Sequence, residues 1–358
     1  MIDILKKEDK VTSKQASKQA SKQAGRQADV DIFKIIACIL ILLRHQYHLG
    51  FPDGSFPFST AWIFVEFFFA ISGYFTIVHF RKNQKKDDID LAAKEAIIYA
   101  KKKWIRFLPY TFISVYIKCT MNYLNEGHGL SRFIIAFLEG SLLIRGESNN
   151  GVLWYLSAML IVLPLFCFLV QILPRYVSLI FAILGCIIYY DNNVLDCFFP
   201  MHLVRAIVGL SLGIIIYEFS IIIKKHSYTG LGKMILSIIE LGSFSFTVIA
   251  TYYNKSWNIV YVVAFIVALS IAFSAESYSE YIPHSRSLRW LTELSMVIYI
   301  FQFVVADGLY MFTQNFDNVK MKIFYISGTV LISIFIKLIV DLLKSKNILK
   351  KMKELMIK

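Results

Sequence analysis

The sequence predicts an all-α, polytopic membrane protein with about ten transmembrane helices plus one short re-entrant or interfacial helix. Of its 358 residues, 57% are hydrophobic and 15% are aromatic, and the mean hydropathy of +0.58 lies far above that of soluble domains. Apolar runs near the ~20 residues that a helix needs to cross the hydrocarbon recur along most of the chain. Short clusters of Lys and Arg separate these runs, as expected for cytosolic loops.

The net charge of +13 does not indicate a nucleic-acid partner. The basic residues lie between apolar runs, so membrane topology explains them first. The five cysteines lie mostly within apolar runs and have no paired spacing. We therefore expect them to pack in the core, and we expect neither a metal site nor a disulfide framework.

The two ends of the chain are polar. Residues 1–30 contain "SKQASKQASKQA", three copies of one tetrapeptide, and predict a disordered polar cytosolic tail. We expect the first apolar run to act as an uncleaved anchor. Residues 344–358 are expected to form a basic cytosolic tail, and the membrane domain spans residues 31–343.

Eleven apolar runs are candidate spans. They lie at residues 31–49, 57–80, 104–123, 131–145, 151–172, 175–190, 203–223, 230–253, 257–274, 291–313 and 321–343. All basic segments can be cytosolic only if the run 131–145 does not cross, and this run is short and contains Arg132 and Glu139. We therefore predict ten spans with both termini cytosolic, and residues 131–145 as a re-entrant or interfacial helix on the outer face.

Residues 81–103 form the only sizeable polar segment of the membrane domain. Within it, "DLAAKEAIIYAKKK" predicts an amphipathic helix on the inner leaflet. Lys102, Lys103 and Arg106 then fall close together where the span 104–123 begins. This cluster is typical of a positive-inside anchor, and it also suits a ligand that carries several phosphates. Both interpretations remain open.

The first two spans contain ionisable residues, which at bilayer depth cost a few kcal/mol or more and are functional candidates. Lys34 and His45 are eleven residues apart, which places them within about 20° on one helix face and about 16 Å apart along the axis. Glu66 of the second span is expected at the level of Arg44 or His45. A Glu66–His45 pair would orient a general base, whereas a Glu66–Arg44 pair would be a buried structural ion pair.

Further candidates lie where other spans begin. "GVLWYLS" and "HLVRAIVGLSLG" place Trp154, Tyr155 and Arg205 near the expected level of His45. Arginine at such a position often extends to the headgroups, but the glycines on this helix also allow it to point inward. Ser72 and Gly73 of "AISGYF" are typical of close helix approach or of a kink.

Six motifs in order resemble the acyltransferase-3 family of integral membrane O-acyltransferases. They are "DIFKIIACILILLRH", "VEFFFAISGYF", "KKWIRFLPY", "LWYLSAML", "RAIVGLSLG" and "ELSMVIYIFQ". The resemblance covers about residues 31–343 and implies a fold of roughly ten helices. It also implies a cytosolic acyl-CoA donor, usually acetyl-CoA, and transfer of the acyl group to a hydroxyl of an envelope or exported carbohydrate. The acceptor would be such a carbohydrate or a lipid-linked glycan, and we expect a bacterial plasma membrane location.

The resemblance also implies roles for individual residues. His45 matches the family's essential histidine, and Lys34 stands where arginine is usual. Glu66 matches the acidic residue of the "(D/E)xFFxxSG" stretch. The predicted catalytic residues are therefore His45 and Glu66. The predicted donor-binding residues are Lys102, Lys103, Arg106 and Ser72, and the predicted substrate-binding residues are Lys34, Arg44, Trp154, Tyr155, Arg205 and Gln302.

The chain departs from the family pattern in three places. Met159 stands where many members have a glutamate, and Gln302 stands where the late motif often ends in histidine. We also expect a single-domain member without an esterase-like extension. A mechanism with His45 as general base therefore remains, while roles for a second carboxylate or a second histidine do not transfer.

A glycolipid or polysaccharide transporter or flippase is the alternative, because transporters also bury His, Glu and Arg along a pathway. Transporters of this size usually show two related halves, and the sequence shows no internal repeat beyond the tail. An inert receptor or assembly subunit is disfavoured by the charges within the first two spans.

Overall fold

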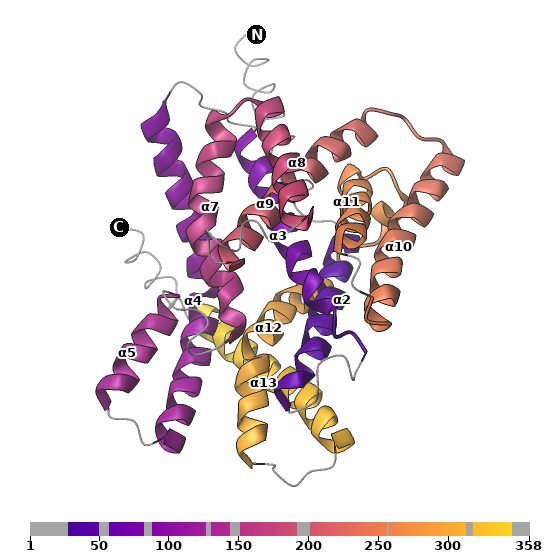
Figure 1. Cartoon of the computed structure of the whole chain (residues 1–358). Coiled ribbons are helices and arrows are strands. Elements are labelled where there is room, and N and C mark those ends of the chain that lie inside the picture. The colour runs from indigo at the N-terminus through magenta and orange to yellow at the C-terminus, as the bar shows by residue number, and fades with distance from the viewer. Residues whose placement is uncertain are drawn as a thin grey trace, which may run out of the picture.

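The computed structural model describes residues 28–49, 57–81, 88–126, 130–143, 151–191, 201–255, 258–312 and 318–345. Every regular element in these ranges is helical (Figure 1), so the predicted all-α class is confirmed. The predicted tails at residues 1–30 and 344–358 lie almost entirely outside the described residues and stay predictions.

The α-helices are α2 (Ala28–Arg44), α3 (Phe64–Arg81), α4 (Ile89–Glu126), α5 (Leu130–Ser141), α7 (Trp154–Ile172), α8 (Arg175–Asp191), α9 (Met201–Lys224), α10 (Gly230–Tyr252), α11 (Asn258–Ser274), α12 (Arg286–Phe312) and α13 (Asn318–Ser345). Short 3-10 helices are η1 (His45–Leu49), η2 (Ala61–Ile63), η3 (Gly151–Leu153) and η5 (Tyr278–Tyr281).

Six helices of the described chain are long and apolar enough to cross a membrane by length and composition: α3, α7, α9, α10, α12 and α13. The chain is therefore a multi-pass membrane protein. The four remaining predicted spans correspond to α2, the second half of α4, α8 and α11. Since α2, α8 and α11 have only 17 residues each, the count of ten stays a prediction.

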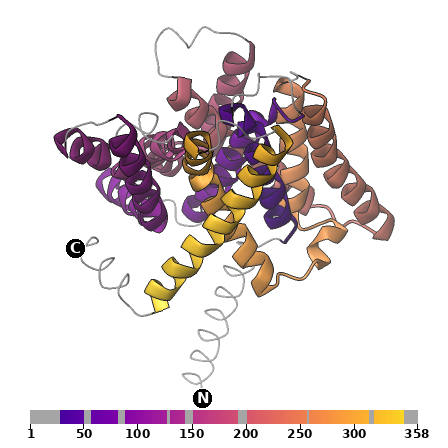
Figure 2. The same cartoon turned by 90° about the horizontal axis from the view of Figure 1, so that it is seen from below.

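Two segments that were not predicted to cross the membrane fold as helices. The predicted amphipathic segment and the following span share one continuous helix, α4, of 38 residues. The run expected to be a short non-crossing helix forms α5, whose 12 residues rise only about 18 Å. Its aromatic side chains pack on α4, with the ring of Phe137 4.8 Å from that of Phe112. Figures 1 and 2 place the α4/α5 pair and the α10/α11 pair at opposite edges of the bundle.

Helices α3 and α9 pack closely near the centre of the bundle (Figure 1). A Cβ atom at Gly73 would overlap the carbonyl oxygen of Leu210, and one at Gly213 would overlap the backbone of Tyr74. Because the partner numbers rise together along both helices, α3 and α9 run parallel. Small residues therefore bring these two backbones into contact, which fixes which side chains face each other at both ends of the pair.

Candidate functional site

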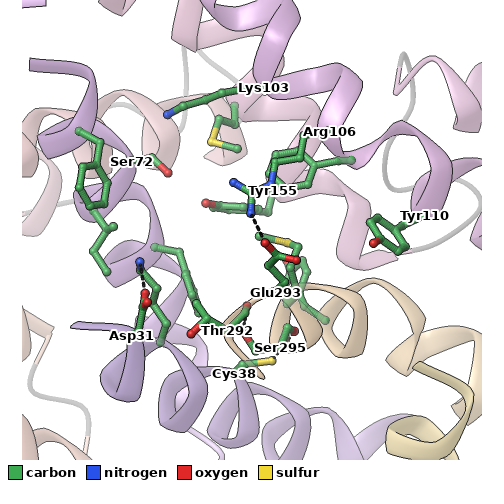
Figure 3. Close-up of a pocket in the computed structure, with 18 of the residues that line it drawn as sticks. Asp31, Cys38, Ser72, Lys103, Arg106, Tyr110, Tyr155, Thr292, Glu293 and Ser295 are labelled. Atoms are coloured by element: carbon green, nitrogen blue, oxygen red, sulfur yellow. Dashed lines mark hydrogen bonds and ion pairs between the residues drawn. The ribbon is translucent and has the colours of Figure 1, made fainter. Parts of the chain in front are cut away.

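A cavity of about 480 Å³ opens between six helices: α2, α3, α4, α7, α12 and α13. Lys103 and Arg106 approach it from α4, while Asp31 and Cys38 of α2 lie on the opposite side (Figure 3). The charged and titratable side chains that line it, apart from cysteine and tyrosine, are Asp31, Lys34, Lys103, Arg106, His284, Arg289, Glu293 and Lys344. Cations thus outnumber carboxylates, and the cavity is suited to an anion.

The basic lining residues differ in how they are held. Lys34 donates a 2.9 Å hydrogen bond to Asp31, and Arg106 lies 3.8 Å from the Glu293 carboxylate while 67% of its side chain is exposed. Lys103 lies over the Tyr99 ring, 4.9 Å from its centroid, and forms no ion pair among the described residues. Lys103 and Arg106 are therefore available to an incoming anion.

Along α3 the cavity lining runs from Val65 to Phe75, which is ten residues or about 15 Å of helix. Most of this wall is apolar, with Ser72 as its hydroxyl. Cys38 of α2 and Tyr155 of α7 also line the cavity, and the Tyr155 ring lies 4.4 Å from that of Phe69 on α3. The cavity thus combines basic residues with a long apolar wall. This wall extends to Val65, the residue next to Glu66.

Glu66 lies at the start of α3 and is only 1% exposed. Its Oε1 accepts a 2.7 Å hydrogen bond from Nε of Arg205 on α9. The Arg205 guanidinium lies between two half-buried indoles, 4.6 Å from the Trp154 ring centroid and 5.2 Å from that of Trp62. The second carboxylate oxygen, Oε2, is buried and has no hydrogen-bond partner among the described residues.

This arrangement corrects both pairings expected for Glu66. Its hydrogen bond and ion pair go to Arg205, and neither His45 nor Arg44 is its partner. The physical reason is the close parallel packing of α3 on α9, which places Arg205 directly opposite Glu66. The alternative in which Arg205 points inward is the one observed.

His45 begins η1, just after the α-helical part of the first helix ends. Its ring makes an edge contact with Phe303 of α12 at 4.7 Å between centroids. A Cβ atom at Gly151 would meet the same Phe303 ring, so this ring packs against both His45 and the segment that leads into α7. His45 therefore lies near the end of α7 that carries Trp154 and Tyr155.

The structure brings most of the predicted site residues together in two groups. Lys34, Ser72, Lys103, Arg106 and Tyr155 line the cavity. Glu66, Trp154 and Arg205 form the second group, next to Val65. Lys102 is exposed and does not line the cavity. Gln302 is fully buried, and neither atom of its side-chain amide has a partner in the described part of the chain.

Several lining residues were missed in the sequence, chiefly Arg289, Glu293 and Lys344, as was Trp62 beside Arg205. Arg289 and Lys344 lie in basic segments that membrane topology already explains. The signal was therefore present, but only the fold shows that α12 and α13 bring these side chains to the same cavity as α4.

Residues 27–340 match the model of the acyltransferase-3 family, which is described as an acyltransferase domain. The chain belongs to the acyltransferase-3 family. No curated protein and no solved structure matches this acyltransferase. The family match covers nearly the whole chain, and it does not favour the transporter alternative.

Proposed function

We propose that this acyltransferase moves an acyl group, most simply acetyl, from cytosolic acyl-CoA to a hydroxyl of an envelope or exported carbohydrate or a lipid-linked glycan. The observation that carries this proposal is one cavity that has both Lys103 and Arg106 in its wall and whose α3 lining begins at Val65, the neighbour of Glu66. Such a cavity suits a donor with a polyphosphate head and a thioester tail.

The donor's phosphates bind Lys103 and Arg106 in this proposal, with Lys102 adding to the positive field from the surface. Both contacting residues lie on α4, one helical turn apart. The pantetheine arm lies along the apolar α3 wall past Ser72 and brings the thioester toward Val65. Under the positive-inside rule the basic segments face the cytosol of a bacterial cell, which is where acyl-CoA is made.

His45 acts as general base. It takes the proton of the acceptor hydroxyl as that oxygen attacks the thioester carbonyl, the carbon–sulfur bond breaks, and the CoA thiolate leaves and is protonated. Arg44 or Arg205 offsets negative charge that develops on the carbonyl oxygen. An acyl-enzyme on His45 is the alternative route, and a covalent adduct in the absence of acceptor would distinguish it.

The test is acetyl-CoA thioester loss in membranes that contain the full chain, with pooled envelope glycans as acceptor. At equal expression, we expect activity in the wild type and its loss in His45→Ala. In Lys103→Ala we expect its loss at acetyl-CoA concentrations near the wild-type KM. Lys94→Ala is the matched control, because Lys94 is exposed on the same helix and lies outside the cavity. A wild type that neither consumes nor binds acetyl-CoA would contradict the proposal and favour transport assays.

A further inference from the structure

One oxygen of the buried Glu66 carboxylate has no hydrogen-bond donor among the residues that the structure describes. Arg205 binds Oε1 through Nε and reaches the backbone oxygen of Trp62 at 3.4 Å through Nη2. Oε2 has no hydrogen-bond partner in the described ranges, and water cannot replace one at the surface because the whole residue is only 1% exposed. A buried carboxylate oxygen without a hydrogen bond is costly, so a donor from outside the chain would stabilise it.

The surroundings decide what kind of donor fits. Arg205 already compensates the charge of Glu66, so the pair is neutral overall and does not call for a cation. The half-buried indoles of Trp62 and Trp154 lie against the Arg205 guanidinium. Aromatic rings beside one fixed polar acceptor are typical of a site that binds a neutral ligand with an apolar body and hydroxyl groups. A sugar ring has both features.

We propose that Glu66 Oε2 accepts a hydrogen bond from a hydroxyl of the acceptor sugar, beside Trp62 and Trp154, and that Arg205 is the positioning residue that holds the carboxylate in place. The inference rests on the proposed function for the identity of the acceptor. Glu66 pairs with Arg205 and not with His45. In this proposal Glu66 holds one hydroxyl of the sugar, and His45 deprotonates the neighbouring hydroxyl. Glu66 therefore determines which sugars are acylated and does not act as the support of the base.

The location of this site supports the assignment. Val65, next to Glu66, and Tyr155, next to Trp154, both line the donor cavity, and the Phe69 ring lies 4.4 Å from that of Tyr155. A sugar bound at Glu66 would therefore meet the thioester end of a donor that enters past Lys103. Two substrates that approach from opposite ends of the bundle would meet between these residues.

The experiment measures sugar binding without transfer. The purified full chain in lipid nanodiscs is titrated with methyl glycosides of glucose, galactose, mannose and N-acetylglucosamine and with pooled envelope oligosaccharides, with tryptophan fluorescence as readout. We expect saturable quenching in the wild type and at least tenfold weaker binding in Glu66→Gln, with Glu66→Asp partly restoring it. Asp90→Asn, an exposed carboxylate on α4, is the matched control and is expected to bind as the wild type does.

A second variant keeps the proposal falsifiable if Glu66→Gln folds poorly. Trp62→Ala removes one half-exposed indole and leaves the Glu66–Arg205 pair, and it is expected to weaken sugar binding at least fivefold and to raise the acceptor KM with the acetyl-CoA KM unchanged. Equal sugar affinity in wild type, Glu66→Gln and Trp62→Ala overturns the inference, as does the lack of a saturable response to every probe.

The two proposals fail separately. Sugar binding that depends on Glu66 in a protein that neither binds nor consumes acetyl-CoA would leave the sugar site standing and remove the donor assignment. Acetyl-CoA consumption with an acceptor KM that is the same in wild type and Glu66→Gln would leave the acyltransferase mechanism standing and remove the sugar site.

Discussion

The two ends of the α3–α9 pair each carry a buried carboxylate and arginine. At one end Arg205 of α9 binds Glu66 of α3, and at the other end Arg81 of α3 binds Glu218 of α9. At the second end both oxygens of Glu218 are occupied, because Arg175 donates to Oε2 at 2.6 Å while Arg81 binds Oε1. At the first end one Glu66 oxygen has no donor within the described chain.

The difference separates a structural ion pair from a binding site on the same two helices. Both oxygens of Glu218 already have an arginine donor from the chain itself, while a buried oxygen that lacks a donor is costly unless a ligand supplies one. Two lysines show the same contrast. Lys337 is fully buried between Glu293 and Asp341, whereas Lys103 lines the cavity without an ion pair among the described residues.

The largest effect is expected at the occupied end. Glu218→Ala leaves Arg81 buried without its carboxylate, and we expect a loss of about 3–5 kcal/mol in the free energy of unfolding. Replacement of both partners in Arg81→Leu/Glu218→Leu should recover much of it. The measurement is thermal unfolding in detergent. We expect sugar binding per folded molecule to be the same as in the wild type. A Glu218→Ala protein that is as stable as the wild type but inactive would invert the comparison.

Part of the fold and of the candidate site could be predicted from the sequence. The helices follow from their apolar runs, and close approach at Gly73 is one of the two outcomes, with a kink, that its small residues predicted. The partner of Glu66 could not be predicted, because it depends on α3 lying parallel to α9, a tertiary arrangement that no local pattern encodes. For the same reason Arg106 was predicted to bind the donor, whereas Arg289, which lines the same cavity, was not predicted.

The next effect concerns the lysine contrast. We expect Lys103→Ala to raise the acetyl-CoA KM about 10- to 100-fold, because a charge-assisted hydrogen bond to phosphate contributes about 1.5–3 kcal/mol. Lys337→Ala should instead lower the thermal unfolding midpoint and change the KM of the folded fraction far less, because Lys337 acts on the cavity only through its partner Glu293. Steady-state kinetics beside thermal unfolding separates the two variants, and equal KM changes in both would remove the distinction.

A smaller effect tests the packing that sets both ends. In Gly213→Ala the new Cβ meets the backbone of Tyr74, so α3 and α9 must separate, and we expect a loss of about 1–3 kcal/mol. Gly242→Ala on α10 is the matched control, since nothing lies near its Cβ position and alanine favours the helix by up to about 1 kcal/mol. Thermal unfolding of both proteins gives the comparison, and equal midpoints would show that the close contact is not needed.

The smallest effect is expected at Glu293, which lies in the cavity wall between Arg106 and Lys337. Its carboxylate repels a phosphate and occupies Arg106, although only weakly because both side chains are more than one-third exposed. Glu293→Gln keeps the shape, and Asp341 still pairs with Lys337. We expect the acetyl-CoA KM to fall about two- to fivefold, in line with the value of an exposed ion pair at or below about 1 kcal/mol. A KM that rises would mean that Glu293 holds Arg106 in its binding position. The carboxylate would then be part of the binding site and not a competitor of the phosphate.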